Sequence, residues 1–183
     1  HGVMPLPPYI HRTPRDPLAA LDQERYQTVY AAHDGAIAAP TAGLHFTTGL
    51  LDDLRGRGIA TAFLTRHAGA GTFRPVRSAA IEDHVVDPER FRLEETTADA
   101  VARCRARRGR VVAVGTTVTR VLEARAREDG EVTPGEGWCD LVIRPGHRFR
   151  AVDALVTNLH LPKSSLLILV AAFAGRERIL GAY

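Results

Sequence analysis

Apolar residues form two patterns along the 183-residue chain, and each pattern predicts a different kind of element. Short apolar runs bounded by glycine, proline or polar residues predict buried strands at residues 36–39, 59–65, 111–114, 141–143 and 155–157. Apolar positions three and four residues apart predict helices at residues 18–32, 47–57 and 96–109, and in the segment after Gly115. A last long helix begins at Ser164 or Ser165 and is apolar almost all round, which predicts that it is buried.

Strands that alternate with helices favour an α/β fold, here a layered α/β/α domain with a mainly parallel sheet. We expect a single domain over residues 1–183, since this length suits one domain with a sizeable core, and the sequence holds no repeat and no low-complexity segment. Residues 1–17 carry five of the eleven prolines and predict an extended arm. Residues 66–73 and 128–137 are glycine-containing and predict loops.

Composition is that of an ordinary soluble globular protein, with 45% apolar and 25% charged residues. The net charge of +3 is compatible with a nucleic-acid partner but does not specify one. Cys104 and Cys139 lack any metal-binding spacing, so we expect reduced thiols in a cytoplasmic protein. The longest apolar run, residues 166–174, is too short to span a bilayer, and the first residues do not read as a signal peptide.

The segment TNLHLPKSS, residues 157–165, contains the only asparagine and the only lysine of the chain, Asn158 and Lys163. Arginine outnumbers lysine 23 to 1, so a retained lysine indicates a position that needs a compact ammonium rather than a planar guanidinium. His160 and Ser164 add further hydrogen-bonding groups between apolar stretches. Chance is the alternative, but the conjunction favours a site.

The segment PTAGLHF, residues 40–46, follows a predicted strand, where open α/β sheets bind ligands. Gly43 permits close backbone approach, Thr41 offers a hydroxyl, and His45 can titrate near neutral pH. An ordinary strand-to-helix turn with a capping threonine is the alternative, since turn glycines are common.

A second glycine-rich segment, RHAGAGTFRPV at residues 66–76, could form a nest of backbone amides for an anion. The pattern is weak evidence alone, and no clear helix follows it, so it is not a dinucleotide-binding fingerprint. It could still line a pocket with His67, Gly69, Gly71, Thr72 and Arg74.

A third segment, VVAVGTTVTRVLE at residues 111–123, passes from a buried strand through Gly115, Thr116 and Thr117 into a helix. Its hydroxyls and helix N-terminal amides would suit a ribose, carboxylate or phosphate, with Arg120 one turn into the helix. Taken without its neighbours, the segment is better explained as an ordinary helix cap with a solvated arginine.

Two further patterns have simple explanations. The histidines lack HxH, HExxH or Cys/His pairing, so no metal site is predicted. Five arginines at residues 103–110 lie at a predicted helix end, where the helix dipole favours cations. A solvated cationic face is the preferred interpretation, and contact with an RNA backbone is the alternative.

Six segments together carry a family resemblance: PLPPYI (5–10), ERYQTVYA (24–31), AAPTAGLHFT (38–47), GAGTFRPV (69–76), VGTT (114–117) with Arg120, Leu122 and Glu123, and VDALVTNLHLPKSSLLILVAAFAG (152–175). In this order they resemble the S-adenosylmethionine:tRNA ribosyltransferase-isomerase family of queuosine biosynthesis. The resemblance spans nearly the whole chain, and its last segment is the most specific.

The resemblance implies that the ribosyl part of S-adenosylmethionine is moved onto 7-aminomethyl-7-deazaguanine at the tRNA wobble position. Rearrangement gives epoxyqueuosine, with adenine and methionine released. No metal or further cofactor is implied, and we expect a monomer with no membrane contact.

The implied reaction needs a general base for the proton beside the sulfonium and a proton donor for adenine. The candidates are His45, His67, His84 and His160, which the sequence does not rank. Other polar and glycine residues of these segments are the candidates for binding the carboxylate, phosphate and ribose groups of the substrates. They are Thr41, Gly43, Gly69, Gly71, Thr72, Arg74, Gly115, Thr116, Thr117, Arg120, Asn158, Lys163 and Ser164.

The chain departs from the family pattern in several places. Members combine an α/β domain with a β-barrel domain, which we expect to be absent from this chain together with the closing aromatic and Gly-Asp motif. After His84 the family reads Lys-Met-His-x-Glu, whereas Asp87 stands here in place of the second histidine. Arg66-His67-Ala68 stands where the family has Leu-His-Val.

These departures leave two other functions open. One is a non-catalytic remnant that binds S-adenosylmethionine or RNA. The other is a diverged transferase that acts on a small deazapurine instead of tRNA, which the modest net charge permits.

Overall fold

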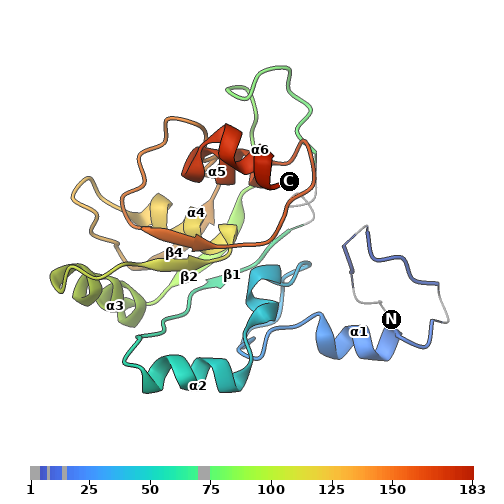
Figure 1. Ribbon diagram of the computed structural model, residues 1–183, viewed down its shortest axis with the longest axis horizontal. Helices are drawn as coiled ribbons and strands as arrows, with labels where there is room; N and C mark the ends of the chain where they lie inside the picture. Colours follow the sequence, from blue (N-terminus) through green and yellow to red (C-terminus); the bar gives the residue numbers. More distant parts are fainter. Residues whose placement is uncertain (1–4, 8, 14–15, 70–74) are drawn as a thin grey trace.

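Two small sheets form the centre of the computed structural model, which describes residues 5–7, 9–13, 16–69 and 75–183 (Figure 1). The first sheet is antiparallel and has the order β1-β2-β4, with β1 at Thr65–Arg66, β2 at Glu89–Leu93 and β4 at Gly135–Cys139. The second pairs β3, Val112–Val114, with β5, Ala154–Val156, in parallel. The protein is therefore a mixed α/β structure, and the prediction of a mainly parallel sheet is wrong.

The antiparallel sheet is built from strands that carry no continuous apolar run. In β2 burial alternates, with Glu89, Phe91 and Leu93 inward and two arginines outward. Phe91 pairs with Gly137 of β4, where a Cβ atom would lie only 3.6 Å from the phenyl ring. Because Glu89 and the glycines of β4 interrupt any apolar run, the apolar pattern predicts neither strand. The loop predicted at residues 128–137 overlaps β4 and is wrong at that end.

Four of the predicted helices are confirmed with small shifts. They are α2 (Thr48–Gly56), α3 (Glu95–Ala106), α4 (Thr116–Arg125) and α5 (Ser165–Ala174). The hydroxyl of Thr47 accepts from the Leu50 amide at 3.1 Å, and that of Ser164 accepts from the Leu167 amide at 3.2 Å. Both are N-cap contacts of the kind that fixes a helix start.

The remaining helical elements differ from the prediction. α1 covers Ala19–Arg25 rather than residues 18–32, has no buried residue and lies apart from the rest of the fold (Figure 1). A 3-10 helix, η1, covers Thr41–His45, and α6 covers Arg176–Ala182. Neither was predicted. The described residues of the segment 1–16 hold no helix or strand.

Residues 36–39 and 141–143 form no strand, although their apolar runs predict one, and of residues 59–65 only Thr65 lies in a strand. Two of these segments make isolated hydrogen bonds in place of strand pairing. The Ile37 amide donates to the Ala68 carbonyl at 2.9 Å, and the Leu141 carbonyl accepts from Arg120 Nε at 2.8 Å. Ile143 is buried although its segment forms no strand, so an apolar run here reflects burial rather than strand pairing.

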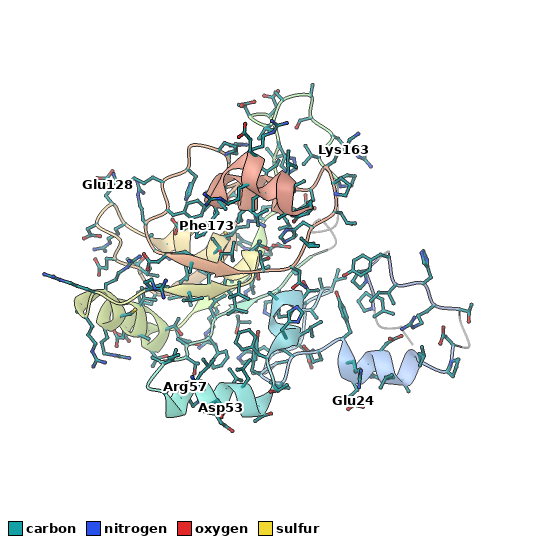
Figure 2. The ribbon with its side chains drawn as sticks, in the orientation of Figure 1. Glu24, Asp53, Arg57, Glu128, Lys163 and Phe173 are labelled. Atoms are coloured by element: carbon teal, nitrogen blue, oxygen red, sulfur yellow. The ribbon has the colours of Figure 1, made fainter. Side chains whose placement is uncertain are left out.

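The main core lies between the two sheets and helices α3 and α4, around Phe91, Leu93, Val101 and Val121. Only Leu169 and Val170 of α5 are buried, so the prediction that this helix is buried all round is wrong. The other α5 residues are half-buried, and Phe173 points inward against the core (Figure 2). Cys104 and Cys139 are not disulfide-bonded. Within the described ranges, no helix is long and apolar enough to cross a membrane.

Candidate functional site

The carboxyl ends of the parallel strands β3 and β5 bring two of the sequence motifs together. Val114 and Val156 are register partners, and the Gly115 amide donates to the Val156 carbonyl at 2.8 Å. The chain then continues as Gly115–Thr117 on one strand and as Thr157–Asn158 on the other. Parallel strands commonly place ligand-binding turns at such an edge.

Gly115 has φ +99° and ψ 146°, a backbone conformation that is essentially restricted to glycine. A Cβ atom here would lie 3.3 Å from Thr117 Oγ1 and 4.0 Å from the Cβ of Ala42. The first contact is tight and the second is an ordinary van der Waals distance, so the positive φ, rather than packing against η1, accounts for the glycine. Thr116 is buried and Thr117 half-buried at the start of α4.

The 3-10 helix η1 carries His45 to the same edge. His45 Nε2 lies 2.9 Å from Asn158 Oδ1, and since that oxygen can only accept, Nε2 donates and Nδ1 is left to accept a proton. A Cβ atom at Gly43 would overlap the hydroxyl of Tyr30, which explains the glycine in this turn. Thr41 is half-buried at the first position of η1.

His160 makes three contacts with two residues, Tyr183 and Thr157, near this edge. Its backbone amide donates to Tyr183 Oη at 2.8 Å, its Nδ1 lies 3.0 Å from the same oxygen, and its Nε2 lies 3.2 Å from Thr157 Oγ1. Burial lowers the pKa of the His160 imidazole because the charged form loses solvation. Nothing in the spacing of the sequence pointed to Tyr183, which lies far from this motif in the chain.

The lowered pKa of His160 gives a pH-dependent prediction. Between the folded pKa and the unfolded value of about 6.5, the unfolded state binds more protons, so stability should fall as pH falls through this window. A His160→Gln variant loses this dependence, and its melting temperature should approach that of the wild type as pH drops below about 6.5. Imidazole NMR titration should show His160 changing charge below its ordinary pKa. A normal or raised pKa would contradict the assignment.

Arg120 lies in a buried ion cluster with Arg66 and Glu89, beneath the site edge. Glu89 pairs with Arg66, lies 3.6 Å from Arg120 Nη1 and accepts from the Gly69 amide at 3.1 Å. Arg66 Nη1 also donates to the Thr117 carbonyl at 3.3 Å. Burial and the charge of Arg120 lower the pKa of Arg66 to about 10, so it stays charged at neutral pH.

This cluster gives Arg120 and Gly69 structural partners that the sequence did not reveal. Burial lowers the pKa of Arg120 as well, and its Nε is fixed on the Leu141 carbonyl. The cluster links the start of the glycine-rich segment to the start of α4. Three predicted binding residues of that segment, Gly71, Thr72 and Arg74, lie outside the described residues.

His67 lies at the end of β1, where its amide donates to the Arg90 carbonyl at 2.9 Å. Its half-buried ring packs against Gly35, whose Cβ atom would lie 2.9 Å from His67 Nδ1. No described contact joins His67 to His45 or His160.

His84 and Lys163 belong to a second place in the fold. The Lys163 carbonyl accepts from the Val76 amide at 2.7 Å, and its exposed side chain lies at the edge of the molecule (Figure 2). Lys163 has φ +56°, an unusual value for a non-glycine residue. His84 is buried, and its pKa is lowered by burial and by the charges of Arg144 and Arg120.

The structure thus brings most of the described predicted residues into two groups, while Arg120 and Gly69 belong to the ion cluster and His67 packs against Gly35. Thr41, Gly43, His45, Gly115, Thr116, Thr117, Asn158 and His160 gather at or beside the ends of the parallel strands. Lys163, Ser164 and His84 gather where the segment after residue 75 meets the start of α5. Among the described residues, no three or more His, Cys, Asp or Glu side chains are grouped so that they could hold a metal ion.

Comparison with known proteins gives a match over the full chain. The family model described as "Queuosine biosynthesis protein" matches residues 1–183. The S-adenosylmethionine:tRNA ribosyltransferase-isomerases of Geobacter sulfurreducens and Pelotomaculum thermopropionicum are 55% and 56% identical over 183 and 182 residues. Each alignment covers 100% of this chain and 52% of the relative, so the chain spans about half the length of the curated relatives it matches.

A solved structure supports the same relationship. The crystal structure of S-adenosylmethionine tRNA ribosyltransferase from Thermotoga maritima aligns with a TM-score of 0.59 at 38% identity. The alignment covers 78% of this chain and 44% of that one. On the full-length family match and the two close relatives, the chain belongs to the queuosine biosynthesis protein family.

Proposed function

We propose that this chain forms part of an S-adenosylmethionine:tRNA ribosyltransferase-isomerase. It would help to transfer and isomerise the ribosyl moiety of S-adenosylmethionine onto 7-aminomethyl-7-deazaguanine in tRNA, giving epoxyqueuosine, adenine and methionine. The names of its relatives support this proposal, and the contact that carries it is the pair His45–Asn158 at the ends of β3 and β5. S-adenosylmethionine serves as co-substrate, with no further cofactor.

The edge of the parallel strands offers the groups that this reaction needs. Asn158 holds the Nε2 proton of His45, so Nδ1 can accept the proton beside the sulfonium. His160, whose lowered pKa favours the neutral imidazole, would donate a hydrogen bond to a leaving base by exchanging the contact of Nε2 with Thr157 Oγ1. Thr116 and Thr117 lie at the N-terminus of α4, where hydroxyls and amides suit ribose oxygens or a carboxylate.

The tRNA substrate would place the reaction in the cytoplasm, and we propose a monomeric enzyme. Exposed arginines at the end of α3 lie on the surface and are available to phosphates. Arg105 is the exception, since it pairs with Asp153 at 2.8 Å and donates to the Arg150 carbonyl.

The test of this function is tRNA-dependent release of adenine by the natural protein. With S-adenosylmethionine and tRNA bearing the deazaguanine, His45→Ala should lower turnover by about 10²–10⁴-fold, the usual contribution of a general base. His33→Ala is the matched control, because His33 is exposed and lies outside the site, and it should leave turnover unchanged.

Other outcomes identify the alternatives. Binding of S-adenosylmethionine without turnover would favour a non-catalytic binding protein. Adenine release with the free deazapurine and without tRNA would favour a small-molecule transferase. Full turnover in the His45 variant would remove His45 as the base.

A further inference from the structure

Tyr183 reaches back from the end of α6 to the loop that connects β5 with α5, residues 157–164. Gly175, with φ +91°, separates α5 from α6, and Ile179 of α6 packs against the buried cluster around Leu169. The end of α6 therefore lies beside this loop (Figure 1). None of residues 157–164 is buried, so the loop depends on hydrogen bonds for its position.

The imidazole of His160 lies between Tyr183 and the end of β5. Its Nδ1 is 3.0 Å from Tyr183 Oη, and its Nε2 is 3.2 Å from Thr157 Oγ1. Thr157 directly precedes Asn158, whose Oδ1 holds His45 Nε2. Nε2 is therefore the ring nitrogen on the side of the candidate site, and Nδ1 is the one that Tyr183 holds.

The hydrogen bonds of Tyr183 Oη favour one tautomer of this ring. The backbone amide of His160 can only donate, so Oη accepts from it at 2.8 Å. The phenol proton is then free to donate to Nδ1, and a hydroxyl that accepts from one group while it donates to another is strengthened cooperatively. In the reverse arrangement Oη would accept twice from His160, and its own proton would have no acceptor among the described contacts.

We propose that Tyr183 is a positioning residue, which fixes His160 as the tautomer that carries its proton on Nε2, on the side of the candidate site. Tyr183 acts through His160 and touches no substrate itself. The role of this proton rests on the proposed function, in which Nε2–H donates a hydrogen bond to the leaving adenine. The lowered pKa of His160 supports the assignment, because only a neutral imidazole has a tautomer to be fixed.

The first test reads the tautomer in the natural protein by nitrogen-15 NMR of labelled histidine, without substrate and at a pH where His160 is neutral. The shifts of the two ring nitrogens show which of them carries the proton, and in the wild type it should be Nε2. Tyr183→Phe keeps the aromatic ring and removes the hydroxyl. It should move the tautomer ratio toward Nδ1–H by about 3- to 10-fold, the usual worth of one hydrogen bond.

The second test measures adenine release with S-adenosylmethionine and tRNA bearing the deazaguanine. Tyr183→Phe should lower kcat by about 3- to 10-fold and leave KM unchanged, because the fixed proton acts on the departing base rather than on substrate binding.

Two further variants separate the hydroxyl from its surroundings. Leu180→Ala is the matched control on α6: Leu180 is exposed, and its loss should change neither the tautomer nor kcat. Thr157→Val removes the partner of Nε2 and should keep the proton there, because Tyr183 still donates to Nδ1. Tyr183 is itself exposed, so Tyr183→Phe should keep the wild-type circular dichroism spectrum.

The inference is overturned if wild-type His160 carries its proton on Nδ1, or if Tyr183→Phe keeps the wild-type tautomer ratio. A shifted ratio with unchanged kcat would also overturn the positioning role. An equal loss of kcat in Leu180→Ala would show that α6 only braces the loop.

Failure of the proposed function is seen separately, because the NMR measurement needs neither substrate. An Nε2 tautomer that depends on Tyr183, in a natural protein that never releases adenine, would keep the hold of Tyr183 on His160 and remove the enzyme. Adenine release by a protein with the Nδ1 tautomer would keep the enzyme and remove the inference.

Discussion

Replacing Glu89 by glutamine should lower the free energy of unfolding by about 3–5 kcal/mol, the usual cost of removing one partner from a buried ion pair. The Glu89 side chain is 4% exposed, and Arg66 and Arg120, which flank it, are 3% and 9% exposed. Without the carboxylate, two guanidinium groups remain buried and lose the counter-charge that they share. The Gly69 amide also loses a charged acceptor.

Hydrogen exchange of the natural protein is the appropriate measurement, because it reads stability locally in β2 and β4. The effect should extend to the start of α4, since Arg66 also donates to the Thr117 carbonyl. Glu136→Gln on β4 is the matched control: its side chain is 64% exposed, and its pair with Arg90 spans 3.6 Å. We expect a change within about 0.5 kcal/mol there. Equal, small effects in both variants would show that the buried cluster does not hold the sheet.

Features set by local sequence could be predicted. The N-caps at Thr47 and Ser164 depend on a hydroxyl and on the amide three residues later, so the sequence predicts these helix starts correctly. Gly115 could be identified as a special turn position because its strand and helix are contiguous with it. The gathering of the Gly115 and Asn158 motifs at one edge follows from parallel pairing of β3 and β5.

Features set by distant partners could not be predicted. β2 and β4 stabilise each other through backbone pairing, while Glu89 occupies an inward position that is ordinarily apolar. The glutamate is tolerated there only because Arg66 and Arg120 arrive from β1 and α4. The same pairing turns Arg120 from a predicted ligand contact into a buried residue. The contacts of His160 likewise need Tyr183 from the far end of the chain.

Replacing Glu123 by glutamine should lower the free energy of unfolding by about 2–4 kcal/mol, because buried amides would lose their acceptor. The Glu123 side chain is 1% exposed at the end of α4. Its carboxylate accepts from the amides of Arg150, Ala151 and Val152 at 2.9–3.0 Å, and His147 Nε2 lies 3.3 Å away. Glutamine has one acceptor oxygen and one donor nitrogen, so at least one of these amides would face another donor.

The loss should appear first as faster hydrogen exchange at the amides of Ala151 and Val152, which lead directly into β5. Because β5 ends at Val156, loosening this anchor should also disturb the contact of Asn158 with His45 and reduce turnover. Glu131→Gln is the matched control, since its carboxylate is 52% exposed and pairs only with Arg127 on the surface among described contacts. Its effect should stay within about 0.5 kcal/mol. Unchanged protection at Ala151 and Val152 in the Glu123 variant would show that the carboxylate does not anchor this segment.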